Sequence, residues 1–152
     1  VQRGGDHQVR VIPGADACTT ALVSSGLPAD RFVFEGFLPH KKGRATRLGE
    51  LAGRDITTVL YESPHRIERL LKELLGAAGA ERMVCVCREL TKAFEEHLRG
   101  PLGSVYETVR ARGRLKGEIV VVLAPASYRE PGADGAGAET AGGEQAGGRH
   151  GE

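Results

Sequence analysis

Residues 57–76 read TTVLYESPHRIERLLKELLG and contain a strand pattern, a turn and a helix pattern in direct succession. The segment Thr57–Tyr61 is β-branched, apolar or aromatic, which is typical of a buried strand. Ser63 and Pro64 follow it as an expected helix N-cap and first-turn proline. Apolar residues then recur on one helical face until Gly76, where we expect the helix to end; they are Ile67, Leu70, Leu71, Leu74 and Leu75. A strand followed closely by an amphipathic helix predicts an α/β unit.

The same alternation of strand and helix patterns extends on both sides of this unit. Short apolar runs rich in β-branched residues predict further strands at Val9–Ile12, Val84–Cys87 and Glu118–Leu123. Helical patterns occur at Asp16–Ser25, ended by Gly26, at Arg44–Ala52, ended by Gly53, and at Ser104–Arg112. The alternation predicts an α/β fold in which helices cover the faces of one sheet.

Length and composition indicate one globular body followed by a tail. The chain has 152 residues, of which 40% are hydrophobic and 27% charged, as in ordinary globular domains. Residues 126–152 are rich in glycine and alanine, with Tyr128 as the only large apolar side chain, so we expect a disordered tail there. The tail has two arginines against five acids, and subtracting its −3 from the whole-chain +1 leaves +4 for residues 1–125. A mildly basic body is compatible with an anionic partner.

Membrane and redox features limit the expected compartment. No run of about 18 apolar residues is present, as a transmembrane helix would need, and the sequence starts with no visible signal peptide. The chain has an odd number of cysteines, namely Cys18, Cys85 and Cys87. Two of them alternate within one strand pattern, which argues against a disulfide framework. We therefore expect a reduced, cytoplasmic protein. The only methionine is Met83, so a processed protein, a non-AUG start and a fragment are the alternatives for its origin.

Three polar clusters lie where predicted strands end. They are Tyr61–Arg66, Arg88–Lys92 and Pro13–Ala17, the last of which also opens a helix whose free N–H groups can hold a carboxylate or phosphate. Ligands of open α/β sheets bind beyond the carboxyl ends of strands, so we expect one shared rim. Each cluster also has a purely structural interpretation, such as a surface ion pair between Arg66 and Glu62 or a solvated loop after the second strand. No spacing typical of a zinc site or a P-loop is present.

A run of aromatic residues leads directly into a basic segment. The aromatic residues are Phe32, Phe34 and Phe37, and the cations that follow are Lys41, Lys42, Arg44 and Arg47. Aromatic faces beside cations suit unpaired bases and phosphates. The alternative is that the phenylalanines belong to the core and the cations to a solvated helix start. A second basic run lacks interleaved aromatics and is interpreted as solvated surface; it contains Arg110, Arg112, Arg114 and Lys116.

Four motifs in fixed order carry a family resemblance. They are LPADRFVFEGFLPHKKGR at 27–44, YESPHR at 61–66, RELTK with two following glutamates at 88–96, and KGEIV at 116–120. Together they resemble the C-terminal half of the ribosomal RNA small subunit methyltransferase I family, 16S rRNA cytidine 2'-O-methyltransferases of the tetrapyrrole methylase superfamily. The resemblance covers about residues 9–125 and implies the C-terminal domain of a two-domain fold, with a mixed sheet flanked by helices. The family's first domain would precede Val1 and is absent from this sequence.

The resemblance implies a cofactor, an assembly and a substrate. S-adenosylmethionine would be the methyl donor, the enzyme a homodimer, and the target a cytidine ribose of 16S rRNA in the small ribosomal subunit; no metal is implied. The implied cofactor contacts are Gly14, Asp16, Ala17, Tyr61, Glu62, Leu90 and Gly117. The family usually reads PGPSA where this chain reads PGADA at 13–17. Asp16 keeps a capping oxygen, but its negative charge alters contacts with the cofactor carboxylate.

The implied reaction needs a base and a grip on RNA. A ribose hydroxyl is a poor nucleophile unless its proton is removed in step with attack. The candidate catalytic groups are Glu62, Glu89, His65 and Lys92. Arg66 and Arg88 would hold phosphates or orient the acid, and the RNA backbone would be held by Lys41, Lys42, Arg44 and Arg47. Two alternatives stay open: a methylase of the same superfamily that acts on a small tetrapyrrole, and a non-catalytic remnant that binds RNA or another partner.

Overall fold

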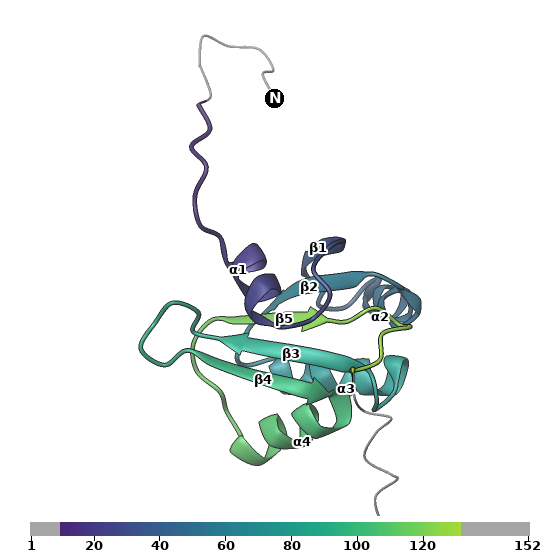
Figure 1. Cartoon of the computed structure of the whole chain (residues 1–152). Helices are drawn as coiled ribbons and strands as arrows, with labels where there is room; N and C mark the ends of the chain where they lie inside the picture. The colour runs from purple at the N-terminus through teal and green to yellow at the C-terminus, as the bar shows by residue number, and fades with distance from the viewer. Residues whose placement is uncertain (1–9, 132–152) are drawn as a thin grey trace, which may run out of the picture.

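A five-stranded mixed sheet runs through the middle of the protein in the computed structural model, which describes residues 10–131 (Figure 1). The strands are β1 (Phe32–Phe37), β2 (Thr57–Glu62), β3 (Met83–Arg88), β4 (Glu96–Pro101) and β5 (Ile119–Leu123). Their order across the sheet is β1-β2-β5-β3-β4, with β1 and β2 parallel and every other neighbouring pair antiparallel. The predicted α/β fold with a mixed sheet is confirmed.

Helices cover both faces of this sheet. They are α1 (Ala17–Ser24), α2 (Arg44–Gly53), α3 (Ile67–Ala78) and α4 (Leu102–Arg112). Along β5, Val121 and Leu123 pack with α2, α3 and α4, whereas Val120 and Val122 pack with α1. Side chains of a strand alternate between faces, so α1 lies on one face and the other three helices on the opposite face. A central strand buried on both faces has to be apolar throughout, as β5 is.

The apolar stripe of α3 supplies much of the larger core. Ile67, Leu70, Leu71 and Leu74 are all buried to 1% exposure or less, and each such side chain contributes roughly 1.5–3 kcal/mol. The expected start and end of this helix are both wrong. Ser63 does not cap it, because its hydroxyl accepts from the His65 N–H and its carbonyl closes a turn onto the N–H groups of Arg66 and Ile67.

At its other end α3 continues through Gly76 to Ala78, and Gly79 caps it at φ +85°. A glycine inside a helix costs only about 1 kcal/mol relative to alanine. The packing of α3 against α2, α4 and the sheet outweighs that cost, so the helix passes the expected stop.

Two observed strands, β1 and β4, were not among the expected strands, and one expected strand is absent. β1 contains a bulge between Phe34 and Gly36, where Gly36 has φ +67°. β4 reads EHLRGP and lies at the sheet edge, where pairing with β3 stabilises it. The expected strand at 9–12 is wrong for its described part, because residues 10–12 pair with no strand among residues 10–131. They run away from the sheet (Figure 1), which leaves Val11 and Ile12 86% and 87% exposed.

The chain returns to the body after β5. The backbone N–H and the hydroxyl of Ser127 donate to Asp55 Oδ1 at 2.9 and 2.6 Å, and Arg99 pairs with Glu130 at 2.8 Å. These contacts lie within the first residues of the expected tail, which begins at Ala126. The remainder, residues 132–152, lies outside the described residues.

Three further observations concern the compartment and metal binding. Cys18, Cys85 and Cys87 are buried free thiols. No helix within residues 10–131 combines the length and the apolar character needed to cross a membrane. In the same part of the chain, no group of three or more His, Cys, Asp or Glu side chains is arranged to hold a metal ion.

Candidate functional site

The carboxyl ends of two strands meet at one edge of the sheet. β2 and β3 both pair antiparallel with β5, and their last residues, Glu62 and Arg88, flank Ile119 from opposite sides. The loops that follow these strands therefore leave the sheet together. The start of α1 joins them, because Ala17 borders the same cavity as Glu62. The shared rim expected from the three polar clusters is confirmed, although the cluster before α1 does not follow a strand in the described residues.

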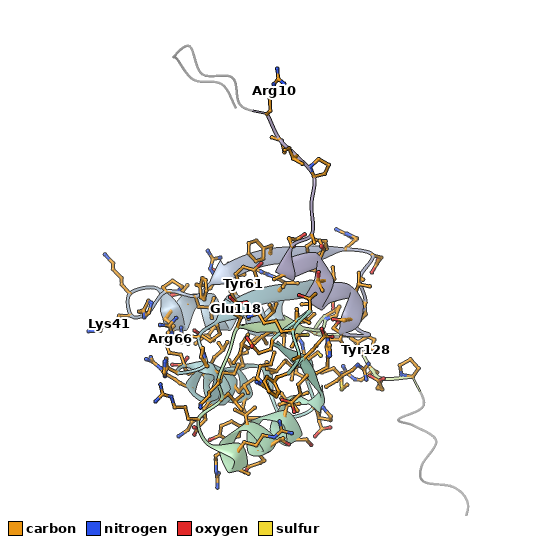
Figure 2. The ribbon with its side chains drawn as sticks, turned by 90° about the vertical axis from the view of Figure 1, so that its left-hand side faces the viewer. Arg10, Lys41, Tyr61, Arg66, Glu118 and Tyr128 are labelled. Atoms are coloured by element: carbon orange, nitrogen blue, oxygen red, sulfur yellow. The ribbon has the colours of Figure 1, made fainter. Side chains whose placement is uncertain are left out.

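A cavity of about 530 Å³, here called the rim cavity, opens at this edge. Its walls include Ala17, Phe37, Tyr61, Glu62, Gly117 and Glu118. A second hollow of about 230 Å³, the side hollow, adjoins it and includes Leu90 and Asp16, while Ala17, Glu118 and Val120 border both. Figure 2 shows Tyr61 and Glu118 over this edge, with Arg66 and Lys41 to their left. Small-molecule sites have volumes of roughly 300–1,000 Å³, so the rim cavity has the size of a ligand site.

Glu62 organises the turn that forms one wall of the rim cavity. Its side chain is only 2% exposed, and its Oε1 accepts from the Ser63 N–H at 2.7 Å and from Arg66 Nε at 2.8 Å. A buried carboxylate needs such partners, because an unpaired buried charge is strongly unfavourable. Glu62 and Arg66 thus hold each other and the turn between them in place.

The loop after β3 holds Glu89 and Lys92 against the turn before β5. Glu89 has φ +52°, and its Oε1 accepts from the Glu118 N–H at 2.9 Å and from Lys92 Nζ at 3.0 Å. Lys92 also contacts Glu118 Oε2 at 3.0 Å. The hydrogen bond from Glu118, followed by that from Lys92, lowers the pKa of Glu89, and the two carboxylates raise the pKa of Lys92. Both groups are therefore charged near neutral pH, and Lys92 in particular is a poor proton acceptor there.

The Glu89 contacts should make this loop sensitive to acid. The folded-state pKa of Glu89 lies below its ordinary value of 4.5, so the stabilisation is present above pH 4.5 and is lost as the pH falls through the lowered pKa. The E89Q variant cannot lose a carboxylate charge. Its free energy of unfolding, measured with urea from about pH 6 to pH 3, should fall less than that of the native chain.

A matched control for this acid sensitivity is E107Q. Glu107 forms an exposed ion pair with Arg110 within α4, and such pairs contribute little to stability. The E107Q variant should keep the pH dependence of the native chain. The same pH dependence in E89Q as in E107Q would contradict the role given to Glu89.

Asp16 caps α1 at the edge of the side hollow. Its Oδ1 accepts from the Thr19 N–H at 2.9 Å and its Oδ2 from Thr19 Oγ1 at 2.6 Å. These bonds lower the pKa of Asp16, so its negative charge is retained and favours a nearby ammonium over a carboxylate. Gly14 lies in the segment before α1, borders neither the rim cavity nor the side hollow, and has no neighbour within 4 Å of an added Cβ.

Tyr61 connects the rim cavity to an aromatic surface on β1. Its ring centroid lies 4.9 Å from that of Phe34 and 5.7 Å from that of Phe37, both edge-on. Phe34 and Phe37 are 50% and 59% exposed, so the alternative that they belong to the core is wrong. Phe37 borders the rim cavity but is missing from the cofactor contacts expected from the sequence. Phe37 directly follows the bulge at Gly36, which only the structure shows.

The six cations expected to contact RNA fall into two groups. Lys41 and Lys42 are exposed and form no ion pair within residues 10–131. Arg44 requires a correction, because it is only 5% exposed and donates through Nε to Glu73 at 2.7 Å and through Nη1 to the Pro39 carbonyl at 3.0 Å. The structure therefore places Arg44 in the packing of α2 against α3, with its charge compensated by Glu73.

The other three expected cations are held by glutamates. Arg47 pairs with Glu35 at 3.1 Å and Glu50 at 2.6 Å, and Arg66 pairs with Glu62 as described above. Arg88 pairs with Glu96 at 3.2 Å and also donates to the Lys116 carbonyl. Their charges are compensated locally, which weakens their attraction for phosphate.

His65 differs from the other candidate bases because no carboxylate among residues 10–131 holds its ring. It lies exposed in the turn after Glu62, where its N–H donates to Ser63 Oγ at 3.2 Å. Its Nε2 is 3.4 Å from Arg114 Nη2. A guanidinium only donates hydrogen bonds, so the ring nitrogen is the acceptor in this contact.

Sequence comparison identifies the family. The family model described as Tetrapyrrole (Corrin/Porphyrin) Methylases matches residues 1–106. The chain belongs to the tetrapyrrole methylase family. It is 46% identical over 127 residues to Ribosomal RNA small subunit methyltransferase I of Mesorhizobium japonicum, an alignment that covers 82% of this chain and 43% of that protein. The protein of the same name from Mycobacterium bovis is 47% identical over 121 residues, covering 78% of this chain and 41% of its own length.

This tetrapyrrole methylase chain thus spans less than half the length of these two relatives. Solved structures of similar fold include the methyltransferase CobJ, with a TM-score of 0.61, 20% identity and coverage of 81% of this chain and 53% of that one. A cobalamin biosynthetic cobalt precorrin-4 methyltransferase aligns with a TM-score of 0.56 and 18% identity over 76% of this chain and 51% of its own. At these identities the likeness shows the fold, and the expected family is confirmed by the sequence relatives.

Proposed function

We propose that this chain is part of an S-adenosylmethionine-dependent methyltransferase that methylates the ribose 2'-hydroxyl of a cytidine in 16S rRNA. The observation that carries the proposal is the position of the rim cavity. Phe37 ends β1 and borders the cavity, and the free Lys41 and Lys42 follow it in the loop to α2. A small-molecule cavity beside exposed aromatics and unpaired lysines suits a cofactor next to an RNA strand. The names of the sequence relatives support methylation of RNA of the small ribosomal subunit. We further propose that the enzyme is a cytoplasmic homodimer.

The residues at the rim fit the proposed cofactor, which supplies an activated methyl group when bound. Tyr61 and Phe37 offer aromatic surface for a purine. Gly117, at φ +95°, lets the backbone of the turn before β5 approach the cavity. The retained charge of Asp16 favours the ammonium of the methionyl part over its carboxylate.

The chain's own residues would contribute chiefly alignment. Methyl transfer requires the attacking oxygen, the methyl carbon and the sulfur to be nearly in line, and the paired Glu62, Glu89 and Lys92 keep the cavity walls in place. We assign these three groups positioning roles. His65 is then the candidate that can accept the ribose proton, since its ring is exposed and no carboxylate within residues 10–131 holds it. Its Nε2 would first have to release the 3.4 Å contact from Arg114.

Calorimetric titration of S-adenosylmethionine tests the proposal. The chain is titrated alone and after addition of the portion of the Mesorhizobium relative that this chain does not cover. We expect binding with both parts present, because the family's cofactor cleft is proposed to lie between two domains. An absence of binding in both titrations, with circular dichroism showing a folded chain, would refute the cofactor proposal and favour the RNA-binding remnant.

Replacing Lys41 and Lys42 with glutamine should weaken binding to a short fluorescein-labelled single-stranded RNA. Each lost phosphate contact should reduce the slope of log K against log salt by about 0.7. Fluorescence anisotropy over a salt series measures this slope. The matched control is R31Q/K72Q, which also removes two exposed cations. Arg31 lies just before β1, at the end of that strand opposite to the rim cavity. An unchanged slope in K41Q/K42Q would exclude these lysines from RNA contact.

A further inference from the structure

A second group of cations lies next to the rim cavity. A hollow of about 280 Å³ is bordered by His65 and Arg114 and shares Pro64 with the rim cavity. Arg114 belongs to the loop between α4 and β5, as does the exposed Lys116. The next residue of this loop, Gly117, borders the rim cavity itself.

Within the described residues, Arg114 and Lys116 have no carboxylate partner, unlike the two arginines that precede them at the end of α4. The neighbouring Arg110 and Arg112 pair with Glu107 and Glu96, but no ion pair within residues 10–131 involves Arg114 or Lys116. Glu68 borders the same hollow without pairing with Arg114. The side chain that Arg114 does contact is His65, at 3.4 Å. Positive charge is thus concentrated beside the cavity, which attracts an anion.

The position of this loop in the sheet places it opposite Lys41 and Lys42. The rim cavity is bordered by the end of β1 at Phe37 and by the start of β5 at Ile119, with β2 between these two strands. Lys41 and Lys42 follow β1, whereas Arg114 and Lys116 precede β5. Unpaired cations therefore flank the cavity from strands on both sides of β2, and a polyanion that crosses the cavity can contact both groups.

We propose that Arg114 and Lys116 form a second phosphate-binding group for single-stranded RNA. The inference rests on the proposed function and extends it. A strand held by Lys41 and Lys42 on one side and by Arg114 and Lys116 on the other would lie with one nucleotide over the rim cavity. Two points of attachment define the direction and register of the RNA strand. Phosphate contacts can do this without recognising the base sequence.

The test compares three double variants by fluorescence anisotropy with the same labelled single-stranded RNA. R114Q/K116Q should reduce the salt slope by about 1.4, twice the value of about 0.7 per phosphate contact, and weaken binding roughly 25-fold at 0.1 M salt relative to a 1 M reference. K41Q/K42Q should show a similar change, and R31Q/K72Q should bind like the native chain. The charge-preserving R114K/K116R should retain the native slope, because phosphate contacts depend mainly on charge.

The outcomes separate the inference from the proposed function. If R114Q/K116Q binds like R31Q/K72Q while K41Q/K42Q loses affinity, the second group is refuted and RNA binding by the lysines stands. If the native chain shows no salt-dependent RNA binding, both proposals fail. The replaced side chains are exposed, so urea unfolding should give native stability for all variants, and a loss of binding cannot then be assigned to misfolding.

Discussion

Replacing Gly117 with alanine should disable the rim cavity and destabilise the chain. An added Cβ would lie 2.5 Å from Glu89 Oε1 and closer still to Glu89 Cγ and Cδ, at a backbone φ of +95°. Glu89 could move aside only by releasing the Glu118 N–H and Lys92. We expect the free energy of unfolding to fall by about 1–3 kcal/mol from strain and overpacking. Binding of S-adenosylmethionine, measured in the two-part complex, should weaken at least about tenfold, which corresponds to about 1.4 kcal/mol.

Gly113 provides the matched control for this substitution. It lies in the same connection at φ +68°, but an added Cβ has nothing within 4 Å, so G113A carries the backbone strain without the collision. The double variant G117A/E89A removes the colliding side chain and should recover part of the stability lost in G117A. If G117A matches G113A in both stability and cofactor affinity, the packing of Gly117 against Glu89 has no role in the site.

Replacing Arg82 with methionine should cause the largest loss of stability among the substitutions considered. Arg82 is 7% exposed, and its guanidinium donates to three carbonyls, those of Ala124 at 2.7 Å, Ala52 at 3.0 Å and Arg54 at 3.0 Å. It thereby joins the end of β5 to the end of α2. Burial lowers the pKa of Arg82, yet an arginine remains charged at any ordinary pH. Methionine would fill much of the volume but remove all three hydrogen bonds. The Arg54 carbonyl would keep the Ala126 N–H at 3.1 Å, and the expected cost is about 2–4 kcal/mol.

Urea unfolding at neutral pH measures this effect directly. The control R31M also replaces an arginine by methionine, but at an exposed position. It should change the free energy of unfolding by no more than about 0.5 kcal/mol. R82K should be intermediate, because one ammonium keeps the charge but cannot reproduce the planar fork that reaches three carbonyls. A loss in R82M no larger than in R31M would show that the three carbonyls find other partners.

A periodic apolar face predicts the presence of a helix, although not its ends. α3 shows this, since its leucines recur with helical spacing and all face the core. β4 could not be predicted, because EHLRGP has no β-branched residue and becomes a strand by pairing with β3. The expected strand at 9–12 failed for the converse reason. Its apolar, β-branched residues suit a strand, but the described part of the chain offers residues 10–12 no partner to pair with.

The candidate site shows the same division between local and long-range information. The three polar clusters were recognised from their positions after strands or before a helix, and they do gather at one edge. The ion-pair and hydrogen-bond partners of individual charged residues could not be predicted from the sequence, because the two members of a pair lie far apart in the chain. Arg44 pairs with Glu73 and Glu89 binds the Glu118 N–H, and only these contacts remove Arg44 from the surface and Lys92 from the candidate bases.

The sequence by itself therefore determined the α/β class, the approximate helices, the central strands and the family, since each follows from local periodicity or from motifs read in order. The tertiary structure alone decided which charges are free and which are paired. It exposed Phe37 beside the cavity, buried Arg44, and left Arg114 and Lys116 without acidic partners among residues 10–131. The physical reason is that a charge's effect depends on its nearest opposite charge and on its access to water, and folding sets both through residues distant in the chain.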